Sequence, residues 1–326
     1  MRILVTGGAG YIGSVVTEFL LERGHDVAVV DNLSTGHRKA VTDQVTFYEG
    51  DIREGSFIET VLGDGFDAVC HFAAFSLVAE SYEEPVKYYE NNIGGTASLI
   101  KAMKATGTKR LLFSSTAAVY GEPDVIPITE ESPLNPVNPY GKTKLAVERL
   151  LEDCSNAWGL SYVSLRYFNA AGATSKHGED HRPESHLIPI VLDAAMGRRD
   201  ELVVYGDDYP TEDGTCVRDY IHVKDLATAH VAAVERLAIE DFVGIFNLGN
   251  GKGFSVLQVI EATEEVTGLK VPYRIGKRRP GDPAVLVASS KKAEDVLGWM
   301  RRFPELASII EDAYRWRRDF PGGYAD

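Results

Sequence analysis

The stretch Arg2-Ile3-Leu4-Val5-Thr6-Gly7-Gly8-Ala9-Gly10-Tyr11-Ile12-Gly13 decides the fold of this 326-residue chain. An apolar run of strand length leads at once into a glycine-rich loop, and an apolar-periodic segment from Val15 to Leu21 comes next. This order predicts a strand, a tight loop and a helix. Glycines let the backbone approach a pyrophosphate, and the free amides at the start of a helix favour an anion. The sequence therefore predicts a dinucleotide site in this loop.

The second predicted strand indicates which dinucleotide binds. Residues 27–30 are all valine or alanine, and they end at Asp31. This is close to the spacing at which an acid reaches the adenosine ribose hydroxyls. A carboxylate there would repel a 2′-phosphate, so Asp31 favours NAD over NADP. The basic cluster His37-Arg38-Lys39 argues the other way, but its simplest interpretation is a solvated loop or helix face.

Strands and helices alternate through the first half of the chain, with further strands expected at residues 45–49, 68–72, 110–115 and 162–167. Alternation of this kind predicts an α/β fold of the Rossmann type, a doubly wound parallel sheet covered by helices on both faces. Ligands of such sheets bind beyond the carboxyl ends of the strands. We therefore expect one crevice lined by the residues at the strand ends, which are Gly7, Asp31, Asp51, Ala73, Ser115, Thr116, Phe168 and Asn169.

The pattern changes after residue 168. Loops, short apolar runs and turn residues such as those at 207–214 predict a smaller mixed α/β domain over residues 169–326. A periodic helix at 223–237 and a strand-like segment at 245–248 read as a return to the first sheet. We expect residues 1–168, with roughly 220–249, to form the cofactor domain.

The composition suits a cytoplasmic protein without nucleic acid or membrane partners. The net charge is -14, which argues against nucleic acid, and no apolar run is long enough to span a bilayer. Cys70, Cys154 and Cys216 are widely spaced and predict free thiols. His177 and His181 are four residues apart but lie in a polar segment, so no metal site is expected.

Tyr140 and Lys144 lie four positions apart at the predicted start of a helix. Residues at this spacing share one helix face, so the Lys144 ammonium can favour the Tyr140 phenolate and lower its pKa, which is about 10 when unperturbed. A tyrosine of lowered pKa can act as a base. The alternative is a solvated helix face, because both residue types are common.

Taken together, these motifs resemble those of extended short-chain dehydrogenase/reductases, and within that family the chain is most similar to the UDP-glucose 4-epimerases. The resemblance runs almost end to end. Residues 6–14, 31–36, 50–53, 71–74, 91–92, 114–121 and 140–144 carry it in the first half, and 166–169, 208–215, 217–223 and 279–282 in the second. The segments that begin at Asp208 and Val217 are the more specific to the epimerases.

The resemblance implies reversible epimerisation at sugar carbon 4, between UDP-glucose and UDP-galactose, with tightly bound NAD. In that reaction Tyr140 removes the proton of the 4-hydroxyl as hydride passes to NAD, Lys144 lowers the Tyr140 pKa, and Thr116 bonds the reacting oxygen. The 4-keto sugar then rotates and the hydride returns. The cofactor residues implied are Gly7, Gly10, Tyr11, Ile12, Asp31, Asn32, Leu33, Ser34, Thr35, Gly36, Asp51, Ile52, Phe72, Ala73, Ala74, Asn92, Ser114, Tyr140, Lys144 and Phe168.

A ketose that rotates must be held by its nucleotide end. The substrate residues implied by the resemblance are Thr116, Asn169, His186, Leu187, Tyr205, Arg218, Arg279 and Asp282. Arginine forks suit a diphosphate, which assigns Arg218 and Arg279 to that group and leaves Asp282 for the uridine ribose. The alternative is that Arg218 pairs with Asp219, and Arg279 with Asp282, as surface ion pairs.

Related activities stay open. Ala117 and Ala118 stand where sugar-nucleotide 4,6-dehydratases carry an acid pair, so elimination has no evident catalyst here. An epimerase of UDP-N-acetylglucosamine or UDP-xylose would use the same catalytic residues, and a non-catalytic dinucleotide sensor is a further alternative. The resemblance also implies a homodimer through residues 82–106 and 140–158.

Leu286 bears on the sugar range. The resemblance places it beside the sugar's 2-substituent, where epimerases restricted to plain hexoses have Tyr and those that accept N-acetyl sugars have a small residue. Leu is intermediate, which implies slow use of UDP-N-acetylglucosamine. The alternative is that Leu286 packs in a strand and faces away from the sugar.

Overall fold

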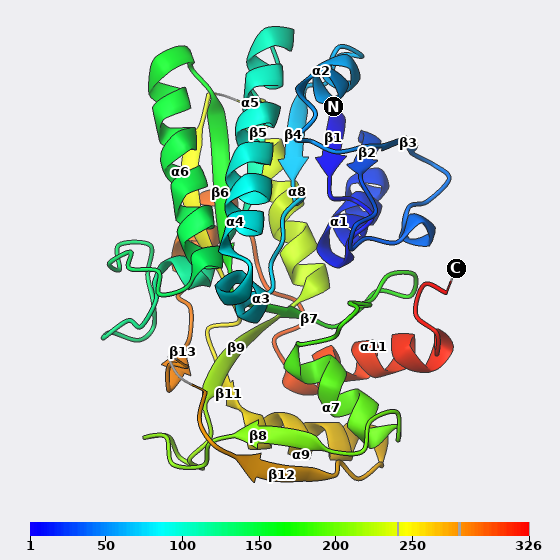
Figure 1. Ribbon diagram of the computed structural model, residues 1–326, viewed down its shortest axis with the longest axis vertical. Coiled ribbons are helices and arrows are strands. Elements are labelled where there is room, and N and C mark those ends of the chain that lie inside the picture. The colour runs from blue at the N-terminus through cyan, green and yellow to red at the C-terminus, as the bar shows by residue number, and fades with distance from the viewer. Residues whose placement is uncertain (240, 280–281, 326) are drawn as a thin grey trace.

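The computed structural model describes residues 1–239, 241–279 and 282–325, and its largest element is a parallel β-sheet (Figure 1). Pro280 and Gly281, which belong to the 279–282 motif, lie outside the described residues. Below the carboxyl ends of the sheet's strands lies a second layer of short strands and helices, and the two layers meet at the strand ends (Figure 1).

Within the described residues, seven strands form the main sheet in the order β10-β6-β5-β4-β1-β2-β3, all paired in parallel. They are β1 (Arg2–Thr6), β2 (Asp26–Asp31), β3 (Thr46–Glu49), β4 (Ala68–His71), β5 (Arg110–Thr116), β6 (Ser161–Tyr167) and β10 (Val243–Leu248). The doubly wound α/β fold expected from the sequence is confirmed. The strand expected at 245–248 lies at the sheet's edge, in register with β6.

Helices cover both faces of the sheet, as a parallel sheet requires. One face packs against α1 (Tyr11–Glu22), α8 (Val223–Ile239) and α10 (Lys291–Leu297), and the other against α2 (Gly55–Leu62), α5 (Gly95–Thr106) and α6 (Pro139–Trp158). The alternation of β1 shows why both faces are apolar: Ile3 and Val5 enter the first core, whereas Leu4 enters the second.

The second layer is built from short strands and three longer helices. In it, β9 (Val217–His222) pairs with β7 (Asn169–Ala171), β11 (Gly253–Ser255) and β13 (Val285–Leu286), and β8 (Leu202–Tyr205) pairs with β12 (Tyr273–Gly276). Their core is completed by α7 (Leu187–Ala195), α9 (Val256–Thr267) and α11 (Leu306–Asp319). The short elements are η1 (Arg38–Ala40), α3 (Val78–Glu83), α4 (Pro85–Tyr88), η2 (Tyr89–Gly94) and η3 (Ala117–Val119). Across the described ranges, every helix is too short or too polar to cross a membrane.

A buried ion pair fixes α6 on the sheet. Arg166 of β6 donates to both carboxylate oxygens of Glu148 on α6, at 2.9 and 2.6 Å, and both side chains are 3% exposed. The Ser115 hydroxyl donates to the same carboxylate at 2.5 Å, and a third Arg166 donor reaches the Tyr120 oxygen at 2.9 Å. Because the pair is forked and further bonded, the cost of burying two charges is offset. The contact sets the position of α6 relative to β5 and β6.

We expect Glu148→Ala to destabilise the protein by about 3–5 kcal/mol, because it leaves the Arg166 guanidinium buried without a counter-charge. Urea unfolding followed by circular dichroism measures this free energy. The control is Glu152→Ala on the same helix, whose pair with Arg149 is exposed and should contribute less than about 1 kcal/mol. Equal losses in the two variants would contradict the role given to the buried pair.

Candidate active site and cofactor site

The glycine loop after β1 is closely packed and has no room for side chains. Gly7 has a φ of 75°, and a Cβ on it would lie 2.5 Å from the Ala73 amide nitrogen. A Cβ on Gly13 would lie 2.2 Å from the Gly7 carbonyl oxygen. Helix α1 starts after Gly10, which caps it with no side chain, so its first amides point into the loop without a side-chain partner there. This arrangement fits a pyrophosphate group.

Asp31, at the end of β2, lies beside this loop and is 8% exposed. Its carboxylate accepts the Ala9 amide at 3.0 Å and the Leu33 amide at 2.8 Å. Burial raises the pKa of Asp31, against the two amide bonds, which lower it. The following residues form a tight turn that carries the predicted Ser34, Thr35 and Gly36, with Leu33 at a φ of 57°. An acid thus stands where the ribose of a dinucleotide is expected.

Asn32 and Asp51 connect the ends of β2 and β3, since the Asn32 amide donates to Asp51 at 2.9 Å. The Arg53 guanidinium holds the pKa of Asp51 at about 2, with burial acting in the opposite direction. Asp51 is therefore charged at neutral pH. Its neighbour Ile52 is 5% exposed and enters the core under α5.

The remaining cofactor candidates flank the same edge of the sheet. The Phe72 and Ala73 backbone lies against Gly7, ahead of Ala74. The side-chain oxygen of Asn92 accepts the Phe75 amide at 2.9 Å, and its side-chain nitrogen donates to the Phe75 carbonyl at 3.0 Å. Asn92 therefore holds the segment after β4.

Tyr11 and Phe168 join this edge to the second layer. The Tyr11 phenol donates to the Gly172 carbonyl at 2.7 Å, across the two layers. Phe168 packs with Val119 and Tyr120 just beyond β6. These contacts, together with those of Ile12 in the core under α1, place the predicted cofactor residues around the carboxyl ends of the main-sheet strands.

Thr116, Tyr140 and Lys144 come together where β5 meets α6. The helix begins at Pro139, and the Asn138 side chain caps it by accepting the Gly141 amide at 2.8 Å. The Thr116 side chain lies close enough to the Tyr140 phenol to lower its pKa. The Lys144 ammonium donates to the Ser114 carbonyl at 2.8 Å and lies 5.9 Å from the centre of the Tyr140 ring.

The pKa values of this group differ from the sequence-based expectation. Burial raises the pKa of Tyr140 to about 12, against the Thr116 bond, which lowers it. Burial also lowers the pKa of Lys144 to about 7, against the charge of Glu148, which raises it. The lowered Tyr140 pKa expected from the sequence is thus wrong. The reason is desolvation, which disfavours the phenolate and the ammonium alike.

A cavity of about 240 Å³ lies in the second layer and adjoins the strand ends. The predicted substrate residues other than Thr116 line it, namely Asn169, His186, Leu187, Tyr205, Arg218, Arg279 and Asp282. Asn169 is held in place by donating to the Asp219 carbonyl at 2.8 Å. Asn169 and Asp282, which are 113 positions apart in the chain, both line this cavity.

The arginines of the cavity have other partners than the alternative interpretation expected. Arg218 pairs with Asp282, and the Arg279 guanidinium lies 3.8 Å from the centre of the Tyr205 ring. Asp219 is fully buried and accepts backbone amides instead, so the pairing of Arg218 with Asp219 was wrong. The pairing of Arg279 with Asp282 was wrong too, because Asp282 pairs with Arg218. Both guanidinium groups therefore reach the cavity, where an anion would meet them.

Leu286 lies in β13, opposite Arg218 of β9. Its side chain is half-buried and packs with the group that contains Ala117 and Phe168, outside the lining of the cavity. Ala117, a member of the same group, directly follows Thr116, so this group lies beside the carboxyl end of β5.

Some structural residues of the site were missed by sequence reasoning. Glu148 follows Lys144 by one helical turn, and an acid on the buried face of α6 could have signalled a buried cation. Asp219 accepts amides from Asn250, Gly251 and Ala288, at 2.6, 3.0 and 3.1 Å, and so ties β9 to two distant loops. Nothing in the local pattern around Asp219 indicates these partners.

The chain is similar to known proteins over its whole length. A UDP-glucose 4-epimerase of Halalkalibacterium halodurans is 56% identical over 328 residues, which cover 100% of this chain and 98% of the relative. A crystal structure of UDP-glucose 4-epimerase from Brucella ovis in complex with NAD aligns with a TM-score of 0.94 at 48% identity, over 96% of this chain and 97% of that one. A crystal structure of UDP-glucose 4-epimerase from Bifidobacterium longum in complex with NAD+ and UDP aligns with a TM-score of 0.94 at 42% identity. The alignment covers 99% of this chain and 100% of that one.

The model of the NAD dependent epimerase/dehydratase family matches residues 3–249. This range holds the glycine loop, Asp31 and the group formed by Thr116, Tyr140 and Lys144. Because this match covers well over half of the chain, the chain belongs to the NAD dependent epimerase/dehydratase family.

Proposed function

We propose that this protein interconverts UDP-glucose and UDP-galactose by inverting the configuration at sugar carbon 4. The observation that carries the proposal is the meeting of Thr116, Tyr140 and Lys144 at the carboxyl ends of the strands, next to a cavity whose lining includes Arg218 and Arg279. Full-length similarity to UDP-glucose 4-epimerases supports it. We assign the cofactor to residues 1–168 with roughly 220–249, and the UDP-sugar to residues 169–326.

NAD, when bound, supplies the hydride acceptor and donor for carbon 4. The residues present fit this group. The glycine loop is open to a pyrophosphate, Asp31 stands where the ribose is expected, and Lys144 uses only one of its three donors on Ser114. The free donors of Lys144 are available to ribose hydroxyls beside the phenol.

Tyr140 is the acid and base of the proposed reaction. Its phenol oxygen takes the proton of the sugar's 4-hydroxyl, and gives it back after the 4-keto sugar has turned over. Thr116 bonds the reacting oxygen and holds the phenol in line. Because the site is buried, the attraction between the Lys144 ammonium and the Tyr140 phenolate is stronger than it would be in water. A filled site therefore favours the proton transfer that burial alone opposes.

The cavity holds the nucleotide end of the substrate while the ketose rotates. Arg218 and Arg279 bind the diphosphate in this proposal, and Asp282 binds the uridine ribose once its pair with Arg218 opens. Asn169, His186, Leu187 and Tyr205 contact the sugar or the uracil. Elimination of water finds no catalyst at Ala117 or Ala118, which supports epimerisation over dehydration.

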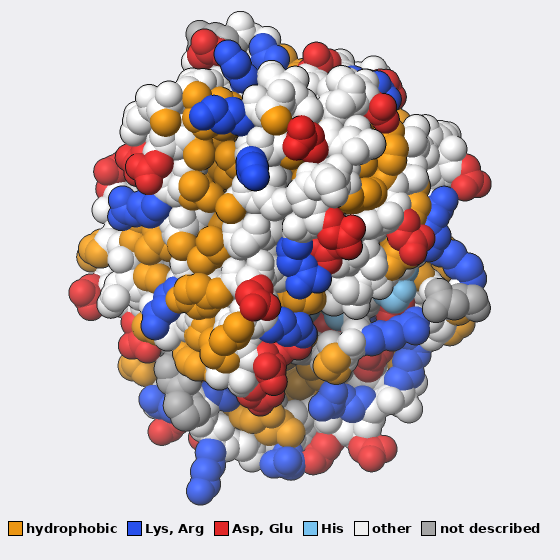
Figure 2. Space-filling view, turned by 45° about the horizontal axis from the view of Figure 1, so that its top comes forward, with side chains coloured by type: hydrophobic (Ala, Val, Ile, Leu, Met, Phe, Trp, Pro, Cys, Tyr) orange, Lys and Arg blue, Asp and Glu red, His pale blue; other side chains and the backbone are white. Residues whose placement is uncertain are grey.

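We propose a homodimer for the assembly and the cytoplasm for the location. Figure 2 shows one face of the molecule on which hydrophobic side chains are spread over the left half. On the segment that precedes and begins the proposed interface, large hydrophobic side chains are exposed: Val78, Tyr82, Val86 and Tyr89. Pairing of two copies through residues 82–106 and 140–158 would cover Tyr82, Val86 and Tyr89.

The activity is tested by the conversion of UDP-glucose to UDP-galactose without added NAD. We expect the parent protein to catalyse it and Tyr140→Phe to lower turnover by roughly two to four orders of magnitude, which is the usual contribution of a positioned acid and base. Tyr273→Phe, which removes an exposed hydroxyl from β12, is the control and should match the parent. Turnover by Tyr140→Phe at the level of this control would rule out Tyr140 as the base.

Cofactor choice is tested by denaturing the purified protein and identifying the dinucleotide that it releases. We expect NAD or NADH, because the buried Asp31 carboxylate would repel a 2′-phosphate. Asp31→Ser should narrow the preference for NAD over NADP in binding to the stripped protein. Release of mainly NADP from the parent would contradict this assignment.

Sugar range is tested at Leu286. We expect detectable but slower epimerisation of UDP-N-acetylglucosamine than of UDP-galactose, and its selective loss in Leu286→Tyr. A hydrophobic wall discriminates by fit, at about 1–3 kcal/mol per methylene. Both substrates are assayed on parent and variant. If Leu286→Tyr changes the two activities equally, Leu286 packs in β13 without gating the pocket.

A further inference from the structure

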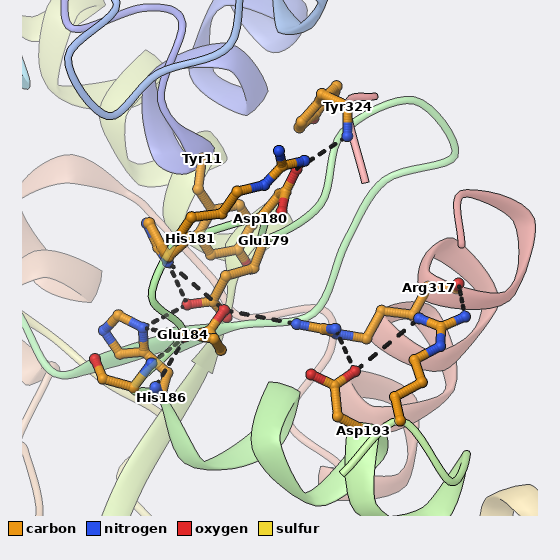
Figure 3. A network of polar contacts seen from close by, with 12 residues as sticks. Tyr11, Glu179, Asp180, His181, Glu184, His186, Asp193, Arg317 and Tyr324 are labelled. Carbon is orange, nitrogen blue, oxygen red and sulfur yellow. Dashed lines mark hydrogen bonds and ion pairs between the residues drawn. The ribbon is translucent and has the colours of Figure 1, made fainter. Parts of the chain in front are cut away.

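Four side chains of one loop converge beside the cavity. Figure 3 shows Glu179, His181, Glu184 and His186 pointing toward one another between α1, α7 and α11. One ligand-type atom from each lies within 4.8 Å of all the others. The sequence analysis expected no metal here because it considered His177 and His181. In the structure His177 turns away to Glu18, at 4.0 Å, and His186 takes the place beside His181.

The distances between these atoms suit a tetrahedral metal ion. The Nδ1 atom of His181 lies 3.2 Å from Glu179 and 3.8 Å from Glu184, and Nδ1 of His186 lies 2.8 Å and 3.1 Å from the same two carboxylates. Zinc binds imidazole nitrogen and carboxylate oxygen at about 2.0–2.2 Å, so a tetrahedral ion separates its donors by about 3.3–3.6 Å. The four separations between histidine and glutamate bracket this value, with His181 measured to Oε2 and His186 to Oε1 of Glu184, and the donors of all four residues lie within 4.8 Å of one another.

Two atoms of the cluster lack hydrogen-bond partners. Among the described residues, the buried Nδ1 of His181 and the buried Oε2 of Glu184 make no well-aligned hydrogen bond, although Nδ1 lies 3.2 Å from Glu179 and Oε2 lies 3.6 Å from the Arg317 guanidinium. Buried polar atoms in this condition are rare and call for an occupant, because leaving them unpaired costs free energy. Both atoms are in the set that converges, and both would be satisfied by one ion.

The charges of the surroundings agree with a divalent cation. The cluster holds two carboxylates, and Arg317 lies 3.6 Å from Glu184 while it also pairs with Asp193 at 2.6 Å. Asp193 also pairs with Arg198, at 4.0 Å. As metal ligands both imidazoles are neutral, and the two carboxylates then carry the charge that one divalent ion balances.

We propose that Glu179, His181, Glu184 and His186 bind a structural Zn²⁺ ion. Imidazole ligands favour zinc over magnesium or calcium, and four protein donors leave no open position for catalysis. The ion fixes the loop that carries His186 and Glu179, both of which line the cavity. It also holds this loop against Tyr11 of α1. The rings of Tyr11 and His181 pack edge to face, with their centres 6.4 Å apart. The metal thus joins the cofactor loop to the wall of the substrate cavity.

The first test measures metal content. Untagged protein, purified without chelator, is analysed by inductively coupled plasma mass spectrometry, and we expect about one zinc per chain. His181→Gln and Glu184→Gln should lose it, whereas His177→Gln, a histidine of the same segment outside the cluster, should keep it. Parent protein that carries no zinc after incubation with zinc and desalting would overturn the proposal, as would equal zinc in the parent and both cluster variants.

A second test uses the parent protein and does not depend on folded variants. We expect removal of zinc by EDTA to lower the melting temperature and re-addition of zinc to restore it. Replacement by Co²⁺ should produce the strong visible bands of tetrahedral cobalt, which Glu184→Gln should lack. A melting temperature unchanged by EDTA, together with weak octahedral cobalt bands, would show that the cluster is only an internal network of protonated histidines and carboxylates.

Discussion

The contact of Glu148 with Arg166 is the constraint on which the arrangement of Thr116, Tyr140 and Lys144 depends. It locks α6 to β5 and β6 by a forked ion pair at 2.6 and 2.9 Å, deep in the molecule. Lys144 lies one helical turn before Glu148 and Tyr140 lies two turns before it, on the same face. A shift of the helix along the sheet would move the phenol from Thr116 and the ammonium from Ser114. A buried ion pair resists such a shift because it loses both charge compensation and hydrogen bonds.

Asp219 has the corresponding role beside the cavity of the second layer. Its carboxylate accepts the amides of Asn250, Gly251 and Ala288, so that β9, the loop after β10 and the segment after β13 are held together. Burial raises the pKa of Asp219 to about 6, against these amide bonds, which favour the charged form. Arg218, the residue directly before Asp219, is therefore held at the edge of the cavity by a fixed backbone. The main sheet fixes the residues at its strand ends, and the Asp219 carboxylate fixes the backbone that carries Arg218.

Burial also decides the protonation of Tyr140 and Lys144. The pKa of Tyr140 is raised and that of Lys144 is lowered, so desolvation disfavours the phenolate and the ammonium together. Thr116 acts against this effect at Tyr140, and the charge of Glu148 acts against it at Lys144.

Local patterns in the sequence determined the features that depend on near neighbours in the chain. The strand, loop and helix of residues 2–22 follow from alternating and helical periodicity, and the doubly wound sheet that they predicted is confirmed. Membership of the epimerase/dehydratase family, and NAD as its cofactor, could also be predicted from motifs whose glycines and acid have local roles. The individual site residues and the domain boundaries remain predictions.

Only the tertiary structure decided which distant charges meet and what burial does to them. Arg218 pairs with Asp282, 64 positions away, rather than with the adjacent Asp219, and His181 meets His186 and two glutamates rather than His177. The pKa of Tyr140 rises because the whole site is buried, although Lys144 lies at the expected spacing. Partner choice and desolvation depend on the path of the entire chain through space, whereas spacing along one helix or strand depends only on a few neighbouring residues.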